Sequence, residues 1–293
     1  MTAVLVVGLI LALGWAALAV AAWWINSATL RDTDEVLLHF LLRFTQTYTR
    51  VLHKVRYEGL EHVPRRTFAS HPPGGGWVSD DEPPIIVVCN HTAGIDPLLV
   101  QCGMPFEVRW MMAEDMRLPV LEWFWRVSRV IFVDRERQSG TSVRAAVAHL
   151  KHGGCIGIFP EGHIARPPET LLPFKEGIGL LVRRAKAMVL PVVISGTPPR
   201  DPAWASLWLA SESVVRFLPP INYAHSKLSA AEIRTDIFER FKGATGWPEA
   251  ERVPQVIDER LYVVGMDGRY HDAEQMLQPL EPEFEARVEA MNA

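Results

Sequence analysis

The sequence predicts an α/β protein with a mixed, mainly parallel sheet flanked by helices, preceded by an N-terminal transmembrane helix and a second, membrane-proximal helix. In the middle of the chain, short apolar runs alternate with segments of helical periodicity, as strands and helices do in α/β folds. Near the N-terminus, residues 3–24 form an uncharged apolar run that is long enough to cross a hydrocarbon layer of about 30 Å as a helix. The 293 residues, 48% of them hydrophobic, suffice for one large domain plus an anchor.

Residues 1–30 are expected to form a single-pass transmembrane anchor. A cleavable signal peptide is the alternative, but the apolar run has no basic region before it and is longer than a signal core. Basic residues follow the run, and the positive-inside tendency then places the rest of the chain on the cytoplasmic side of the membrane. These basic residues are Arg31, Arg43, Arg50, Lys54 and Arg56.

Residues 31–62 are expected to contain the membrane-proximal helix. Apolar side chains recur at helical spacing from Val36 to Leu52 and are interleaved with basic ones. Such a helix either lies on a bilayer surface or packs against a domain, and its nearness to the anchor favours the bilayer. Residues 63–84 follow as a proline- and glycine-rich loop that leads into the main domain.

Residues 85–220 are predicted to form the α/β domain. Its strands are expected at Ile85–Cys89, Phe106–Met112, Val130–Val133, Cys155–Phe159 and Val189–Ile194, with a further edge strand at Val214–Leu218. Its helices are expected at Pro97–Cys102, Pro119–Val127, Ser142–Lys151 and Glu176–Lys186. Residues 221–293 are expected to be a C-terminal helical extension of short polar or amphipathic helices.

The charge and the cysteines argue against two classes of protein. A net charge of −4, a sequence pI near 6.2 and the absence of a Lys/Arg-rich run argue against nucleic-acid partners. Cys89, Cys102 and Cys155 lie in apolar stretches and lack the spacing of a zinc site. They are expected to be reduced core residues, and no metal site is predicted.

A histidine and an aspartate follow the first predicted strand of the domain. His91 and Asp96 are separated by four residues. Histidine can accept a proton from an alcohol near neutral pH, and a nearby carboxylate can orient its ring and stabilise the imidazolium. The pair therefore predicts transfer of a group onto a hydroxyl. The alternative is structural, because Asp96 followed by Pro97 has the form of a helix N-cap with proline in the first turn.

Three arginines surround the predicted strand at residues 130–133. Arg135 follows the strand closely, with Arg129 and Arg137 nearby. Guanidinium groups can bind a phosphate through two parallel hydrogen bonds, although neighbouring arginines are also typical of a solvated charge cluster. This strand end is a candidate phosphate-binding site.

A carboxylate, a glycine turn and two cations gather on the loop after the predicted strand at residues 155–159. The block Phe159-Pro160-Glu161-Gly162 leads to Arg166 and then to Lys175. These side chains are candidate binding residues for a polar or anionic substrate. The chain has no Gly-x-Ser-x-Gly block, so no serine nucleophile is predicted.

In this order, the blocks resemble those of the glycerolipid acyltransferase family, which contains 1-acylglycerol-3-phosphate (lysophosphatidic acid) and glycerol-3-phosphate acyltransferases. The combination of Asn90-His91, four residues and Asp96 with a later Phe-Pro-Glu-Gly block carries the resemblance, which covers about residues 85–196. The resemblance implies an acyl-CoA or acyl-carrier protein donor, membrane lipids as partners, and neither a bound cofactor nor a metal.

The resemblance also assigns roles to individual side chains. It implies that His91 is the general base on the acceptor hydroxyl and that Asp96 orients it. Arg135 would bind the phosphate of the acceptor, and Glu161 with Gly162 would position the acceptor. The most direct implication is the conversion of lysophosphatidic acid to phosphatidic acid.

Two departures from the family pattern leave the acceptor open. The family commonly continues the last block as Glu-Gly-Thr-Arg-Ser, whereas here His163 and Ile164 follow and the arginine comes two positions later, at Arg166. Arg129 stands where the family usually has glycine. The alternatives are the same reaction on another lysolipid, such as another lysophospholipid or a lyso-ornithine lipid, and a non-catalytic lipid-binding protein of the same fold. Arg129, His163 and Ile164 are candidate specificity residues.

Overall fold

The computed structural model describes most of the chain between residues 36 and 250. The described residues are 36–65, 83–133, 140–250, 255–257, 260–264 and 270–272, together with Gly14 and Val20. The predicted anchor at residues 1–30, apart from Gly14 and Val20, and most of the predicted loop at residues 63–84 lie outside them. Within the described parts of the chain, no helix is both long and apolar enough to cross a membrane.

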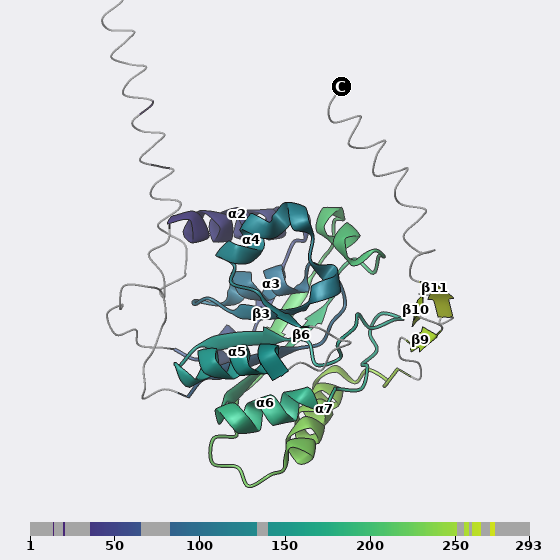
Figure 1. Cartoon of the computed structure of the whole chain (residues 1–293). Helices are drawn as coiled ribbons and strands as arrows, with labels where there is room; N and C mark the ends of the chain where they lie inside the picture. Colours follow the sequence, from purple (N-terminus) through teal and green to yellow (C-terminus); the bar gives the residue numbers. More distant parts are fainter. Residues whose placement is uncertain are drawn as a thin grey trace, which may run out of the picture.

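A mixed, mainly parallel sheet is the centre of the described fold, as the sequence predicts (Figure 1). The strands run in the order β1-β7-β6-β2-β5-β3-β4, with β8 paired to β6. The five strands from β6 to β4 are parallel to one another, whereas β7 and β8 pair with β6 in the antiparallel sense. The bounds are β1 Arg56–Glu58, β2 Ile85–Cys89, β3 Arg109–Ala113, β4 Ile131–Val133, β5 Cys155–Ile158, β6 Met188–Ser195, β7 Val214–Phe217 and β8 Ile221–Asn222.

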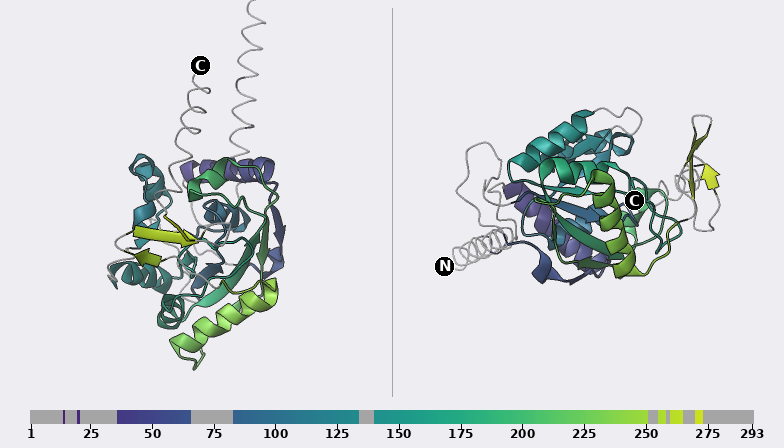
Figure 2. Two further views of the ribbon diagram at one scale, coloured as in Figure 1. Left: turned by 90° about the vertical axis from the view of Figure 1, so that its right-hand side faces the viewer. Right: turned by 90° about the horizontal axis from the view of Figure 1, so that it is seen from below.

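Helices cover both faces of this sheet. On one face lies α3 (Asp96–Gly103), and α2 (Val36–Leu52) packs on α3 through Leu38, Leu42 and Cys102. The other face carries α5 (Gly140–Lys151), α6 (Gly177–Ala185) and α7 (Ala230–Thr245), with α6 and α7 packed against each other (Figure 2). The remaining helices are α4 Glu122–Val127 and the 3-10 helices η1 Leu60–His62, η2 Glu114–Met116, η3 Pro119–Leu121 and η4 Ala203–Trp208.

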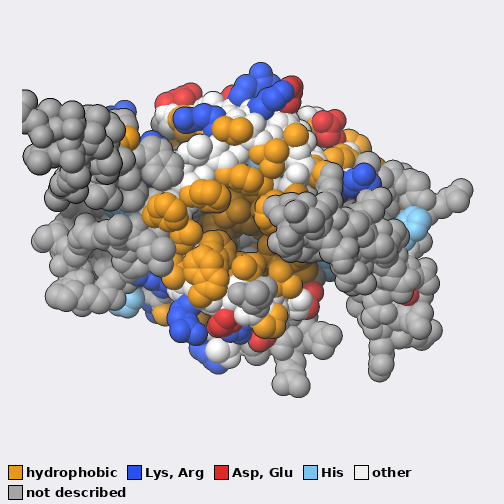
Figure 3. Space-filling model, turned by 90° about the horizontal axis from the view of Figure 1, so that it is seen from above, with side chains coloured by type: hydrophobic (Ala, Val, Ile, Leu, Met, Phe, Trp, Pro, Cys, Tyr) orange, Lys and Arg blue, Asp and Glu red, His pale blue; other side chains and the backbone are white. Residues whose placement is uncertain are grey.

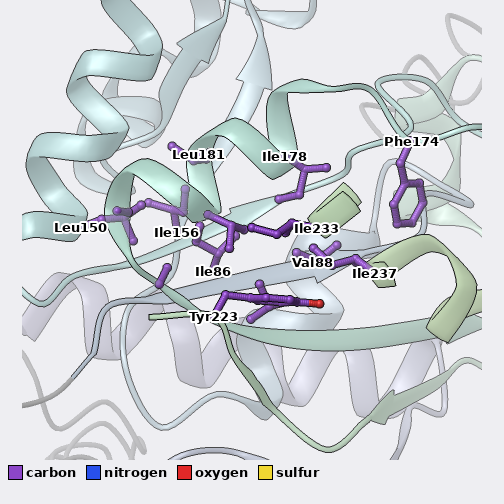
Figure 4. Close-up of a cluster of buried hydrophobic side chains, with 14 of the residues drawn as sticks. Ile86, Val88, Leu150, Ile156, Phe174, Ile178, Leu181, Tyr223, Ile233 and Ile237 are labelled. Carbon is purple, nitrogen blue, oxygen red and sulfur yellow. The ribbon is translucent and has the colours of Figure 1, made fainter. Parts of the chain in front are cut away.

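The central strand β2 separates two hydrophobic cores. Because successive side chains of a strand point to opposite faces, the five fully buried residues of β2 serve both cores. Ile85, Val87 and Cys89 face the core with α3, and Ile86 and Val88 face the core with α5, α6 and α7. Figure 4 shows the second core, with Ile86, Val88 and Ile156 from the sheet and Leu150, Ile178, Leu181, Ile233 and Ile237 from the three helices.

Two predicted elements differ in the structure. The strand expected at an edge, β7, pairs with β6 on one side and with β1 on the other, so β1 is the edge strand. The sequence prediction placed β1 inside the membrane-proximal helical segment, because three residues are too few to show strand periodicity. The helix predicted at Pro119–Val127 is divided into η3 and α4.

The C-terminal extension is only partly helical. Helix α7 begins with a capping box in which Ser229 and Glu232 bond to each other's backbone N–H, and it ends at Gly246 in the left-handed conformation. Beyond it, β9 (Gln255–Ile257), β10 (Arg260–Val264) and β11 (Tyr270–Asp272) form an antiparallel sheet. The prediction of a helical extension at residues 221–293 therefore does not describe β9, β10 and β11.

Candidate active site

Asn90 carries the pairing of β2 and β6 one residue beyond the end of β2. Its side-chain amide donates to the Ile194 carbonyl at 2.9 Å and its Oδ1 accepts from the Ile194 N–H at 2.8 Å. The buried amide thus fixes the point at which the chain leaves the sheet, directly before His91. Local sequence gives no signal of this role, because the partner lies 104 positions away.

His91 and Asp96 form a hydrogen-bonded pair at this carboxyl end of β2. The His91 Nδ1 lies 2.9 Å from Asp96 Oδ2, and the same carboxylate accepts from the N–H groups of Thr92 at 2.7 Å and Ala93 at 2.8 Å. The Asp96 side chain is fully buried, whereas the His91 side chain is 20% exposed. Because these partners all donate to the carboxylate, His91 carries its proton on Nδ1 and leaves the Nε2 lone pair to accept another.

The Asp96 side chain does not cap its own helix. Ile95 occupies the N-cap position of α3, and Asp96 begins the helix with Pro97 behind it. The carboxylate turns back toward residues 91–93 and bonds to them. Asp96 thus stands at the start of α3, but its side chain orients His91 and does not cap the helix. The N-cap alternative drawn from the sequence therefore does not describe this side chain.

Glu161 joins the loop after β5 to the loop after β2. It is 1% exposed, and its two oxygens accept from the backbone N–H groups of His91 at 2.9 Å and Leu172 at 3.0 Å. Burial raises the pKa of Glu161 to about 8, the two N–H donors oppose that shift, and the charge of Asp96 adds to it. This buried carboxyl group positions the backbone of His91, while Gly162, at φ +74°, makes the turn that follows.

The Arg166 guanidinium bonds to groups within the protein. Its five N–H donors make five hydrogen bonds, to the carbonyls of Thr92, Ala165 and Arg200 and to both oxygens of Asp201. The residue is only 4% exposed. A phosphate could bind Arg166 only by displacing these contacts, which favours a structural role for this residue over the predicted phosphate-binding one.

The structure places three of the other predicted binding residues on one loop, and the fourth lies outside the described residues. Lys175 is exposed, and its side chain runs so close over Gly162 that a Cβ at that glycine would meet Lys175 Nζ. His163 and Ile164 are partly exposed and follow the same turn. These residues share the loop that carries Glu161, whereas Arg135 lies outside the described residues.

Arg129 adopts the left-handed conformation, with φ +50°. A glycine reaches this region without strain, which gives a physical reason for glycine at this position in the family pattern. The Arg129 guanidinium pairs with Glu107 at 2.7 Å. Its charge is thus directed to a partner within the domain, which weakens its assignment as a specificity residue.

A family model described as Acyltransferase matches residues 54–195, the segment that contains this site. This segment, just under half of the chain, is similar to the acyltransferase family. The acyltransferase match begins before the predicted domain start at residue 85 and includes the edge strand β1.

Within the described residues, no group of three or more His, Cys, Asp or Glu side chains is placed to hold a metal ion.

Several curated relatives of the acyltransferase segment are named as 1-acyl-sn-glycerol-3-phosphate acyltransferases. The 1-acyl-sn-glycerol-3-phosphate acyltransferase of Bacillus subtilis is 26% identical over 113 residues, which are 38% of this chain and 55% of the relative. Its counterpart in Borreliella burgdorferi is 31% identical over 119 residues, which are 39% of this chain and 46% of the relative. The match thus spans about half the length of these relatives.

The fold also has a solved counterpart. The crystal structure of the 1-acyl-sn-glycerophosphate (LPA) acyltransferase PlsC from Thermotoga maritima superposes with a TM-score of 0.55 at 20% identity. The superposition covers 77% of this chain and 87% of that chain. The acyltransferase domain therefore has the same α/β architecture.

Proposed function

We propose that this protein transfers an acyl group from a thioester donor to the free hydroxyl of a lysophospholipid, as a step of phospholipid biosynthesis. The hydrogen-bonded pair of His91 and Asp96, at the carboxyl end of the central strand of an acyltransferase-family fold, carries the proposal. The curated relatives, named as 1-acyl-sn-glycerol-3-phosphate acyltransferases, support lysophosphatidic acid as the first acceptor to test.

The proposed reaction needs one base and an oriented acceptor. His91 Nε2 takes the hydroxyl proton as the acceptor oxygen attacks the thioester carbonyl. The new C–O ester bond forms, the C–S bond breaks, and the imidazolium returns the proton to the leaving thiolate. Asp96 stabilises the imidazolium between these steps, and general base catalysis of this kind contributes roughly 10²–10⁴-fold. The donor is proposed to be acyl-CoA or an acyl-carrier protein, without a metal or bound cofactor.

The acceptor head group has a second candidate. Arg166 uses its five donors inside the protein, which removes one cation from the set available to a phosphate monoester. Losing one charge-assisted contact costs about 1.5–3 kcal/mol of binding. Arg135 and Lys175 remain the proposed phosphate ligands. A lysolipid with a larger or different head group, including a lyso-ornithine lipid, is therefore the alternative acceptor.

Membrane attachment is proposed from α2. Phe40, Phe44 and Val51 are exposed on the side of α2 opposite the buried Leu38 and Leu42, and residues 36–52 contain no acid. Viewed from above, hydrophobic side chains gather around a hollow on the face that carries α2 and α4 (Figure 3). An apolar surface of this kind fits a lipid bilayer, with the domain on the cytoplasmic side.

Acyl transfer to a lysolipid panel tests the function. Purified protein receives labelled acyl-CoA or acyl-carrier protein together with lysophosphatidic acid, other lysophospholipids and lyso-ornithine lipid. Product is expected with wild type and with His152→Ala, an exposed histidine control, but not with His91→Ala. If wild type binds lipid but forms no product, the non-catalytic alternative holds. The preferred acceptor identifies the head group.

A further inference from the structure

We propose that Phe159 and Trp110 are positioning residues that hold the ring of His91 at its working angle. Three aromatic rings stack in a row beside the site. The His91 ring lies 4.1 Å from the Phe159 ring at an interplanar angle of 20°, and the Phe159 ring lies 5.2 Å from that of Trp110 at 17°. This inference rests on the proposed role of His91 as the base.

The stack follows from the order of the strands. Trp110 lies on β3, Phe159 directly follows β5, and His91 follows β2 after one residue. These strands are neighbours in the order β2-β5-β3, and Trp110 is in register with Gly157 of β5. One ring from each strand therefore meets at the same edge of the sheet.

Gly157 makes room for the stack. A Cβ at this position would lie 2.5 Å from Trp110 Cε3, so only glycine lets the indole lie flat on β5. The Trp110 Nε1 is buried and has no hydrogen-bond partner among the described residues. Since no hydrogen bond fixes the indole, its position is set by contacts of the ring faces, which is the property that a stacked support needs.

The stack fixes the plane of the His91 ring, which the hydrogen bond to Asp96 leaves free. The hydrogen bond to Asp96 fixes His91 at Nδ1 but leaves the ring plane free to rock about that bond. A parallel ring at 4.1 Å fixes the plane, so the two contacts together direct Nε2. When His91 takes up the acceptor proton, the electron-rich face of Phe159 also attracts the new positive charge. This attraction arises only after proton transfer, and it therefore acts on kcat and not on acceptor binding.

Replacing the middle ring tests the proposal. Phe159→Leu is expected to lower kcat by roughly tenfold with little change in KM, and Phe159→Tyr, which keeps a ring, should restore most of the lost rate. Phe238→Leu is the matched control, since Phe238 is also half-buried and ring-packed, against Phe174, on the other face of the sheet. An unchanged kcat in Phe159→Leu overturns the proposal. So does a raised KM with unchanged kcat, which would mean that the ring contacts the acceptor.

A second measurement does not depend on turnover. The rate at which diethyl pyrocarbonate modifies His91, followed by peptide mapping, is expected to rise in Phe159→Leu and to stay at the wild-type value in Phe238→Leu. If wild type transfers no acyl group, the proposed function fails and this rate alone decides whether Phe159 holds the ring. An unchanged rate in Phe159→Leu overturns the positioning role.

Discussion

His91 is held by one group at the start of α3 and by two groups on the loop after β5. Asp96 contacts its ring, Glu161 accepts from its backbone N–H, and its carbonyl accepts from the Ala165 N–H at 2.8 Å. Both the ring and the backbone of the proposed base are thus fixed before any substrate arrives. Preorganisation of this kind lowers the cost of reaching the reactive geometry.

Asp96→Asn is expected to lower kcat by about 10²-fold with little loss of stability. The amide oxygen can keep the bonds from the N–H groups of Thr92, Ala93 and His91, which all reach one carboxylate oxygen, while the charge that stabilises the imidazolium is lost. Kinetics and thermal melting of Asp96→Asn beside Asp96→Ala check this. The alanine variant should also melt at a lower temperature, and an asparagine variant of wild-type activity would contradict the role of the charge.

Arg166→Met is expected to destabilise the fold by about 3 kcal/mol, because it leaves Asp201 and three carbonyls without their donor. Arg200→Met is the control, since the Arg200 side chain is exposed and only its carbonyl meets Arg166. Chemical denaturation measures the free energy of unfolding. Unchanged stability with a raised KM for phosphate-bearing acceptors would restore Arg166 as a substrate ligand.

His163→Thr combined with Ile164→Arg is expected to raise the use of lysophosphatidic acid relative to lysolipids without a phosphate monoester. The change places a cation two positions after Gly162, where the family pattern has one, and leaves the internal hydrogen bonds of Arg166 in place. Ratios of kcat/KM across the acceptor panel measure the effect. An unchanged acceptor ranking would show that these two positions do not set the choice of head group.

The sequence predicts the chemical pair but not what holds it. His91 and Asp96 are close in the chain, so their spacing and the strand before them suffice to place them together. Arg166 is different, because its partners at residues 200–201 lie on another loop and no local pattern shows that its donors are used. Asn90 escapes prediction for the same reason, as its partner Ile194 belongs to a different strand.

At the scale of elements, α2 has two apolar sides. One side packs on α3, and the other exposes Phe44 at 56% and Val51 at 73%. An ordinary amphipathic helix of a globular domain has one apolar side. The second side supports the bilayer placement that the sequence favours for this helix.

Quenching of a fluorophore by spin-labelled lipids tests that placement. In lipid nanodiscs, a fluorophore on Phe44→Cys is expected to be quenched, whereas one on Arg184→Cys of α6 is not, since α6 lies at the opposite end of the fold from α2 (Figure 1). Labelling is selective because Cys89, Cys102 and Cys155 are buried, free thiols. Equal quenching at both sites would place α2 away from the bilayer.

Elements differ in how far the sequence determines them. The strand Ile85–Cys89 is confirmed to the residue, because a fully buried parallel strand is a continuous apolar run, and here Pro84 and Asn90 bound it. β1 and β9 have three residues each, and their pairing partners, not their own periodicity, make them strands. Such short elements depend on tertiary contacts that a single segment does not encode.

At the scale of the whole molecule, Glu161 is expected to make stability depend on pH. Its pKa is raised to about 8 in the folded protein from an ordinary value of 4.5. The unfolded chain therefore releases this proton first as pH rises, so the contribution to stability is complete below pH 4.5 and is lost between about 4.5 and 8. The slope reaches at most about 1.4 kcal/mol per pH unit.

Comparison with Glu161→Gln isolates this effect from the other titrating groups. Urea denaturation at fixed ionic strength measures the free energy of unfolding of both proteins. The value for wild type minus the value for the variant should fall as pH rises from 5 to 8. The variant is also expected to be less stable at low pH, because its NH₂ group must face one of the two backbone donors. A difference that is constant with pH would contradict the raised pKa.

The joint between α2 and the sheet has a consequence for how the molecule meets a membrane. Only three residues separate Leu52 from Arg56, and His53 within them is buried, bonds to Ser211 at 2.8 Å and accepts from the Ser213 N–H at 3.0 Å. Such a joint leaves no hinge. A helix resting on a bilayer would therefore set the tilt of the entire sheet, and acceptors would reach His91 by sideways diffusion within one leaflet, without any swinging of the domain.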